Sequence, residues 1–465
     1  MTLRRGALLV GAGLVTEMLY LSVALRLSWW QYGMRLNTWS EILGEGQASM
    51  WAVLAGLLVL MVAYACGWYA VSGWRADPRR ALVSGEGSVL GQRALSGSHL
   101  VWGGVLLFAL TLFWLMPITS DLFAYLCQSY LLTDVGVSPL LRAPLDVMPD
   151  RLVQAYLTAY AGRASAYGPA WVVMSAPGTM GPFDVAAGLF YLKGMLVVAF
   201  LGCAWLLERI LKIVRAEAAL EGLYLFAWNP LVLLMAVGDG HNDIVMMAGV
   251  LLAFWLVLHE RWSSALVALA LSAWIKYVSA IFLAPLLLYT WRNLKREERW
   301  PVLGGGALAV AGISILVLLP TRVLESSTAG PWRWITGVVE RLIHPSNWRG
   351  DGGALPAQAL AVGALLFAAV SVVLLWRSDR QRGSRSSLEQ YGAFRHMTDV
   401  SFVMSLLLFA FGAARSQPWH VLWPASLAGL SGRRWAWPAI IGLSALMLGV
   451  QVWVEWGAPG WRLGS

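Results

Sequence analysis

Apolar segments long enough to cross a bilayer recur from one end of this chain to the other. Of its 465 residues, 58% are hydrophobic and 13% are charged, whereas about 25% charged residues are usual in soluble domains. A hydrocarbon core of about 30 Å needs roughly 20 apolar residues per helical span. The sequence therefore predicts an all-α polytopic membrane protein of about 13 transmembrane helices, folded as one integral domain over residues 1–465. The expected spans cover residues 6–26, 50–72, 98–116, 184–209, 219–236, 242–259, 263–274, 276–291, 301–320, 355–376, 397–414, 419–430 and 435–456.

Basic residues indicate which side of the membrane each connecting segment faces. With the N-terminus in the cytoplasm, most of the 34 lysines and arginines fall in inner segments, as the positive-inside rule requires. This distribution explains the net charge of +9 without nucleic acid as a partner. Two large polar loops, residues 117–167 and 321–352, then face the extracytoplasmic side, together with the short segments 238–243 and 415–420.

The side of the membrane on which each later segment lies depends on whether residues 168–182 count as a span. The segment is apolar, but Pro169 and Pro177 interrupt it together with two glycines. Such breaks are typical of interfacial or re-entrant backbone rather than of a full crossing. Counting the segment as a span would place the basic cluster at residues 209–215 outside, so we expect it to be interfacial or re-entrant.

The cysteine pattern argues against redox chemistry. Cys66, Cys127 and Cys203 lie far apart in the sequence, with neither a disulfide framework nor metal-ligand spacing. The sequence also carries no nucleotide-phosphate loop and no GxSxG elbow. We therefore expect no cofactor.

A carboxylate follows the third expected span almost at once. Asp121 stands five residues after Met116, and a charge at the bilayer centre costs about 2.5–3.5 kcal/mol, so such a residue usually lies in a wet, functional cavity. Tyr125 and Gln128 follow at i+4 and i+7, which a helix would place on the same face as Asp121. This face offers an acid, a phenol and an amide to a polyhydroxylated substrate. The alternative is that Ser120 or Asp121 only caps a juxtamembrane helix.

The segment 238–243 gathers two carboxylates, an imidazole and an amide between two apolar spans. The side chains of His241, Asn242 and Asp243 are candidates for orienting the substrate. Histidine and carboxylates also bind zinc or manganese, but their spacing here matches no familiar ligand pattern, and we predict no metal. A plain solvated turn is the third interpretation.

Positive groups on the same side are candidates for binding a phosphate. Lys276 lies between two apolar runs and either reaches an interface or points into a cavity toward an anion. Arg415 and His420 stand in the abrupt turn between the expected spans 397–414 and 419–430, where they are placed to contact phosphate.

Several of these motifs, in this order, resemble a known family. The sequence is similar to the bacterial polyprenyl-phosphate-mannose-dependent α-mannosyltransferases, which belong to the GT-C class of integral-membrane glycosyltransferases. The acidic motif reads Ser-Asp rather than a paired or glycine-preceded aspartate, and His420 stands where the family's motif leads us to expect tyrosine. The resemblance is carried by residues 120–125, 136–139, 167–169, 229–230, 240–243, 275–276 and 418–423.

The resemblance implies a GT-C-like fold in the bacterial cytoplasmic membrane, with an extracytoplasmic active site fed by a lipid-phosphate sugar. Asp121 takes the place of the family's acidic residue in the first large outer loop. The expected reaction moves a hexose, mannose by the resemblance, to a hydroxyl of a glycan, glycolipid or protein acceptor. Because a phosphate-linked sugar already has a good leaving group, the acceptor needs a general base, and Asp121 is our candidate.

Two other functions fit a chain of this outline. A lipid-linked sugar flippase or transporter would also have about a dozen spans with polar groups among them. A polymer ligase would use a polyprenyl-diphosphate donor instead of a monophosphate. Neither alternative accounts as directly for an acid and phosphate-binding groups gathered on one side of the membrane.

Overall fold

The computed structural model describes residues 3–32, 39–72, 87–148, 162–182, 184–323, 387–411 and 417–457. Every regular element in this part of the chain is helical, and the only strand-like pairing there is an isolated bridge between Ser28 and Leu115. The predicted all-α class is therefore confirmed. The expected span 355–376, most of the expected loop 321–352 and Arg415 lie outside the described residues.

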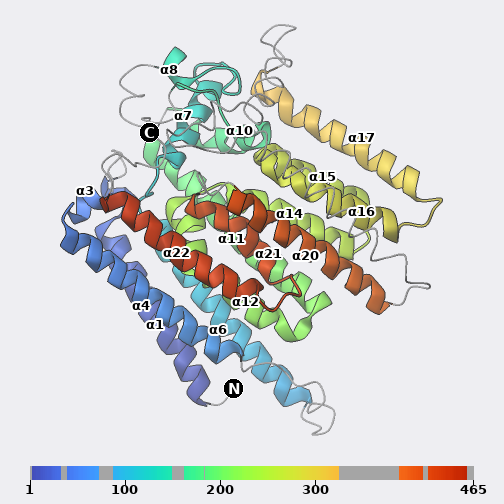
Figure 1. Ribbon diagram of the computed structural model, residues 1–465. Coiled ribbons are helices and arrows are strands. Elements are labelled where there is room, and N and C mark those ends of the chain that lie inside the picture. The colour runs from blue at the N-terminus through green and yellow to red at the C-terminus, as the bar shows by residue number, and fades with distance from the viewer. Residues whose placement is uncertain are drawn as a thin grey trace.

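Long apolar helices make up most of the molecule (Figure 1). In the described part of the chain, six helices are long and apolar enough to cross a membrane, and a bent pair makes a seventh candidate. The structure thus supports a multi-pass membrane protein but not the full count of 13. The six are α1 (Leu3–Arg26), α4 (Gln47–Ser72), α11 (Val185–Val214), α17 (Arg299–Leu318), α20 (Ser387–Phe411) and α22 (Ala436–Gly457).

Further helices occupy the expected spans between these six. The bent pair joins α12 (Ala219–Ala227) to α13 (Pro230–Leu233) and a π-helical turn η3 (Leu234–Asp239), with a bend of 56°. The other helices of this group are α6 (Gly87–Phe113), α14 (Asp243–Leu258), α15 (Trp262–Ile275), η4 (Tyr277–Phe282), α16 (Leu283–Asn293), η8 (Pro418–Val421) and α21 (Leu422–Ala428).

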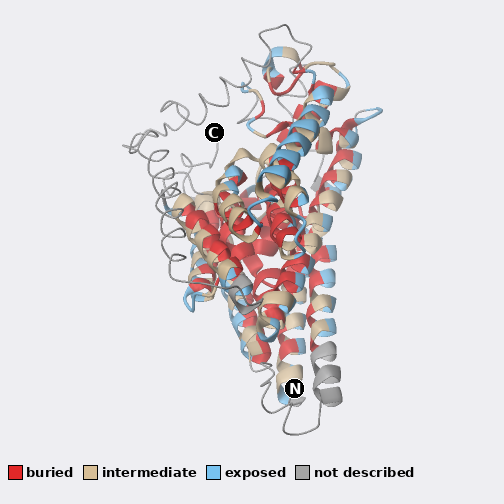
Figure 2. Cartoon of the chain, turned by 90° about the vertical axis from the view of Figure 1, so that its right-hand side faces the viewer, coloured by how far each residue is buried: buried red, intermediate tan, exposed pale blue. Residues whose placement is uncertain are grey.

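The helices are arranged around a buried centre (Figure 2). Helices α1, α4 and α6 form one group, α15 to α17 form another, and α11 and α14 lie between them (Figure 1). α17 keeps most of its apolar side chains on the outside. Apolar side chains facing outward along a whole helix are expected where lipid is the solvent. The interior therefore holds the polar groups.

Short helices gather at one end of the molecule (Figure 1). They are α7 (Asp121–Thr133), α8 (Pro144–Val147), α10 (Pro169–Ser175) and the turn η1 (Ala176–Thr179). The segment expected to be interfacial or re-entrant thus forms a seven-residue helix followed by a 3-10 turn. α10 packs against α7, α15 and α17, so it lies next to the helix that carries Asp121.

Candidate active site

Asp121 is the first residue of α7, and its carboxylate is directed into the protein. The residue is 3% exposed, and its Oδ2 accepts hydrogen bonds from the phenol of Tyr167 at 3.4 Å and from Nδ1 of His241 at 3.1 Å. Ser120, the residue before the helix, makes no side-chain capping bond. A negative charge at a helix N-terminus is favourable, but the partners of Asp121 come from two other segments. The carboxylate therefore does more than begin its helix.

The face of α7 that carries Asp121 packs against residues 165–171. The ring of Tyr125 makes edge contacts with Tyr167 and Trp171, at centroid distances of 5.0 and 4.8 Å. The predicted i, i+4, i+7 alignment thus holds in the structure. Gln128, at the end of this face, accepts a hydrogen bond from Ser165 at 2.9 Å and is buried. Its amide fixes the neighbouring segment in place.

Asp239 connects the second polar region to the first. Its Oδ2 lies 2.7 Å from Nε2 of His241, while its Oδ1 accepts hydrogen bonds from the backbone N–H groups of Ile118 and Thr119 at 2.7 and 2.8 Å. Gly240 has a φ of 87°, a left-handed conformation that favours glycine and turns the chain between Asp239 and His241. The result is a linear arrangement of carboxylate, imidazole and carboxylate, which we call the Asp–His–Asp chain: Asp239, His241 and Asp121.

His241 is positively charged at neutral pH. Burial lowers the pKa of its imidazole, but the carboxylates of Asp239 and Asp121 outweigh this effect and raise the pKa to about 9. The indole of Trp419 stacks on the imidazole at 3.9 Å with an interplanar angle of 17°. A cation against the face of a tryptophan is favourable. Both ring nitrogens then donate, one to each carboxylate.

A second charged pair lies beside this chain. The ammonium of Lys276 is 2.7 and 2.9 Å from the two carboxylate oxygens of Asp243, which also accepts a hydrogen bond from the indole N–H of Trp423. The same ammonium lies 5.8 Å from the ring centroid of Tyr167. Lys276 therefore points into the protein and towards the partners of Asp121, not out to lipid.

The two remaining candidates in this region are neutral. The amide of Asn242 is fully buried, and neither its oxygen nor its nitrogen has a hydrogen-bond partner within the described residues. His420 accepts a hydrogen bond from the backbone N–H of Gln417 at 3.1 Å, and its ring lies 4.6 Å from that of Trp423. Burial and the positive charge of Lys276 lower the pKa of His420 well below its usual range. Its imidazole is therefore uncharged at neutral pH.

A buried lysine links the helical core to both polar regions. Lys193 of α11 is fully buried, and its ammonium donates hydrogen bonds to the carbonyl oxygens of Leu115 and Gly238, at 2.8 and 2.6 Å. One carbonyl precedes the segment that leads to Asp121, and the other precedes Asp239. This lysine therefore sets the spacing between the two ends of the Asp–His–Asp chain.

Sequence reasoning brought together most of these residues but missed three. Asp121, His241, Asp243 and Lys276 do converge in the structure. Asp239 stood in the dense polar cluster without a role of its own, and nothing local marked Tyr167 or Trp419 as contacts of Asp121 and His241. Within the described residues, no group of three or more histidine, cysteine, aspartate or glutamate side chains is arranged to hold a metal ion.

Comparison with known proteins identifies the family of the chain. Residues 9–292, more than half of the chain, match the family model described as alpha-(1->6)-mannopyranosyltransferase, N-terminal domain. The chain is also 26% identical over 460 residues to alpha-(1->6)-mannopyranosyltransferase A of Mycobacterium tuberculosis, which covers 94% of this chain and 80% of the relative. No solved structure matches. The resemblance seen in the motifs is confirmed: this multi-pass membrane protein belongs to the alpha-(1->6)-mannopyranosyltransferase family, and it is a glycosyltransferase.

Proposed function

We propose that this chain moves mannose from a polyprenyl-monophosphate donor to an acceptor hydroxyl on the extracytoplasmic face, with Asp121 as the general base. The acceptor is a glycan, a glycolipid or a protein. The observation that carries the proposal is the position of the Asp121 carboxylate. Its Oδ2 accepts from His241 and Tyr167, and the described residues give Oδ1 no hydrogen-bond partner. One oxygen is thus fixed while the other is available to an alcohol.

The reaction is a single displacement at C1 of the sugar. The acceptor hydroxyl gives its proton to Oδ1 of Asp121 as its oxygen forms a bond to C1. The bond between C1 and the phosphate oxygen breaks, and the polyprenyl phosphate leaves with the electron pair. Direct displacement inverts C1, so a β-linked donor gives an α-glycoside. The base contributes because a neutral alcohol is a poor nucleophile.

Nearby groups are suited to the leaving phosphate. The side chain of Lys276 is 20% exposed, although its partner Asp243 is fully buried, so the ammonium can share a phosphate oxygen. His420 offers a neutral N–H, and we assign Arg415 the same phosphate-binding role from its place in the sequence. Positive charge at the point where negative charge develops lowers the barrier.

The sugar and acceptor hydroxyls are assigned to the polar groups around this cation. The buried, unpartnered amide of Asn242 is suited to a pair of hydroxyls. His241 and Asp243 orient the groups beside it, and Tyr125 and Gln128 complete the wall along α7. The contact between Gln128 and Ser165 supports an indirect contribution from Gln128, through the shape of the loop.

An apolar cavity next to Lys276 supports a lipid-linked donor. It has a volume of about 500 Å³ and lies between α15, η4, α16 and α17, within the size range of ligand sites, roughly 300–1,000 Å³. Trp274 and Tyr277 line it on either side of the segment that holds Lys276. We assign this cavity to the first isoprene units of the donor, because its walls are apolar and two of its lining residues, Trp274 and Tyr277, flank Lys276 in the chain.

The arrangement of the polar regions supports an extracytoplasmic active site. Three of the segments expected to face outward, at residues 117–121, 238–243 and 417–420, meet around the Asp–His–Asp chain. We retain the GT-C-like architecture of about 13 spans for the complete chain, since the helices that are described fall where hydropathy places them.

The experiment that tests the proposal replaces Asp121 by asparagine. The substitution keeps the shape but removes the base, so we expect the initial rate of transfer from polyprenyl-phosphate mannose to fall roughly a hundredfold to ten-thousandfold. Asp134→Asn is the matched control, because Asp134 stands at the other end of the same helix and is exposed. Donor binding should be nearly unchanged in both variants, and Asp121→Asn should still fold but unfold at a lower temperature, because it loses the charge-assisted bond to His241.

Three outcomes would count against the proposal. A near wild-type rate in Asp121→Asn would remove the assignment of the base. Translocation of a lipid-linked sugar by the purified protein without a new glycosidic bond would favour a flippase. Transfer from a polyprenyl-diphosphate donor only would favour a polymer ligase.

A further inference from the structure

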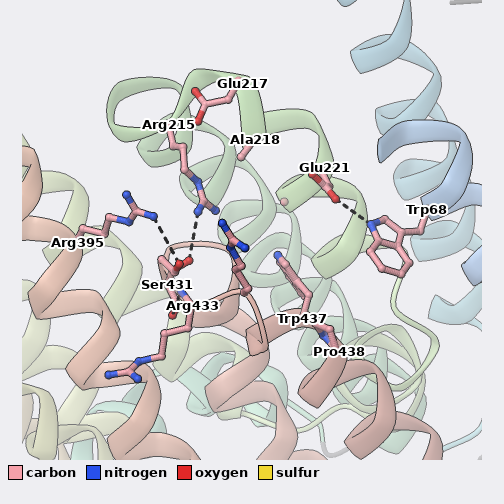
Figure 3. A pocket seen from close by; sticks show the side chains of 13 residues that line it. Trp68, Arg215, Glu217, Ala218, Glu221, Arg395, Ser431, Arg433, Trp437 and Pro438 are labelled. Carbon is pink, nitrogen blue, oxygen red and sulfur yellow. Dashed lines mark hydrogen bonds between the residues drawn. The ribbon is translucent and has the colours of Figure 1, made fainter. Parts of the chain in front are cut away.

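A second polar cavity lies at the far end of the helices from Asp121. Its volume is about 390 Å³, and Trp68, Arg215, Arg395, Arg433, Arg434 and Trp437 are among the residues that line it. Figure 3 shows three of these arginines grouped around Ser431, with Trp68 and Glu221 on the opposite side. These side chains come from the ends of α4 and α11, from α12, α20 and α22, and from the connection between α21 and α22. Segments distant in the sequence thus build one pocket.

The length of α11 measures how far this cavity lies from the Asp–His–Asp chain. Lys193 contacts the backbone beside Asp239, and α11 continues from there to Val214, next to Arg215. At about 1.5 Å per residue this stretch rises roughly 30 Å, which is about the thickness of a bilayer core. The arginine cavity therefore lies at the opposite membrane interface from the Asp–His–Asp chain.

The cavity carries an excess of positive charge. Four arginines line it against two glutamates, and Glu221 accepts a hydrogen bond from the indole of Trp68 at 2.9 Å. Arg215 donates to the carbonyl oxygens of Gly429 and Ser431, at 2.8 and 3.4 Å. These two bonds fix the guanidinium of Arg215 in the wall of the cavity. Arg433 and Arg434 are exposed at the rim.

We propose that this cavity binds a phosphate group, supplied by the headgroup of an anionic lipid or by free phosphate. One guanidinium can donate two parallel hydrogen bonds to two oxygens of a phosphate. Basic pockets between helices at the cytoplasmic interface also suit lipid headgroups. The two tryptophans fit the same interface, where their indoles lie at headgroup level. The site is separate from the proposed transfer reaction, which takes place at the other end of α11.

Binding is tested on the full chain in detergent by native mass spectrometry. The probes are dioleoyl phosphatidic acid, dioleoyl phosphatidylcholine as a lipid with the same chains but no net charge, and inorganic phosphate as a competitor. The test variant is Arg433→Gln with Arg434→Gln. The matched control is Lys295→Gln with Arg296→Gln, which removes the same charge from exposed positions outside the cavity. Trp437→Leu is a second test variant that changes the cavity wall without changing charge.

Phosphatidic acid should bind the wild type more tightly than phosphatidylcholine does. The paired arginine variant should bind it at least roughly tenfold more weakly, since a charge-assisted contact is worth about that factor or more. The lysine–arginine control should retain wild-type binding, and Trp437→Leu should weaken it. Competition by inorganic phosphate would identify the phosphate group alone as the ligand, and its failure to compete would identify a lipid. Equal binding of the two lipids, or equal losses in the test and control pairs, would overturn the proposal.

Discussion

His241 is the residue at which the separate parts of the candidate active site meet. Its two nitrogens bond carboxylates from α7 and from the π-helical turn, and its ring lies against Trp419 from the last third of the chain. An imidazolium held in this way leaves neither carboxylate without an opposite charge. Removing one residue of the Asp–His–Asp chain should therefore change the pKa values of the other two. The dependence of stability on pH measures this change.

The stability of the protein should depend on the proton of His241. The pKa of the folded imidazole is about 9, above the ordinary value of 6.5. Its contribution to the free energy of unfolding is therefore complete below about pH 6.5 and is lost as the pH rises through about 9. Thermal unfolding in detergent across this range should show a falling midpoint. His241→Gln should remove that part of the pH dependence, and an identical pH profile in the variant would show that another group titrates.

Asp239 should act as a positioning residue for the transfer reaction. Asp239→Asn removes a charge-assisted hydrogen bond worth about 1.5–3 kcal/mol, so we expect the rate to fall roughly tenfold to a hundredfold. The fall in stability with pH should also move to lower pH, because His241 loses its nearest carboxylate. Asp399→Asn is the control, since Asp399 also accepts a backbone N–H bond, at 2.7 Å from Gly432, but lies beside the arginine cavity. A loss of rate without any change in the pH profile would show that Asp239 is only structural.

Part of this residue-level picture could be predicted from the sequence. Asp121, His241, Asp243 and Lys276 were identifiable because charged groups beside apolar spans are costly and therefore few. The pairing of Asp239 with His241 was not predictable, because it depends on a π-helical turn and on the left-handed Gly240. The charge state of His420 also depends on burial, which spacing in the sequence does not report.

Among the elements, α10 and the residues before it form the side of the site nearest to α15. The backbone N–H of Gly168 donates to the carbonyl of Ile275 at 3.0 Å, and a Cβ added at Gly168 would come within 2.0 Å of the carbonyl oxygen of Trp274. A glycine is required at this crossing because backbone approaches backbone. The contact holds Tyr167 next to Lys276.

Gly168→Ala should separate these two elements. The added methyl group forces the backbone apart at a cost of about 1–3 kcal/mol, and Tyr167 moves away from Asp121 and Lys276. We expect a lower unfolding midpoint and a clear loss of transfer. Gly162→Ala is the control, because a Cβ at this exposed position meets nothing within 4 Å. Equal behaviour of the two variants would show that the crossing does not position the site.

Helix positions were more predictable than helix shapes. The apolar run at residues 219–236 was expected as one span, but the structure bends it by 56°. Pro230 has no N–H to donate, and the side chain of Asn229 accepts from the backbone of Leu231 and Val232, so a new helix begins there. The run at 276–291 begins as a 3-10 helix because Lys276 has an extended backbone. Hydropathy locates such segments but does not report their breaks.

Across the whole molecule, the polar groups divide into two sets at opposite ends of α11. One contains the Asp–His–Asp chain, and the other contains the arginine cavity. The division matches the distribution of basic residues in the sequence, which assigned these arginines to the inner side. This division predicts the orientation of the molecule in the membrane, which can be measured.

Thiol labelling should place the two ends on opposite sides of the membrane. In a Cys66→Ala background, Ala166→Cys next to the site should react with an impermeant maleimide on intact spheroplasts. Glu297→Cys, in the connection before α17, should react only after the membrane is opened. Both positions are exposed in the structure, and Cys127 and Cys203 are buried. The reverse labelling pattern would place the transfer reaction in the cytoplasm.

The fully buried Lys193 limits how the enzyme can admit a substrate. Its ammonium donates to the backbone before Asp121 and to the backbone before Asp239. Separating these two segments would leave the buried ammonium without hydrogen-bond acceptors in a region that holds little water. The two backbone segments that Lys193 joins are therefore expected to keep their positions during turnover. Any rearrangement that admits a substrate is then expected away from these two carbonyl groups.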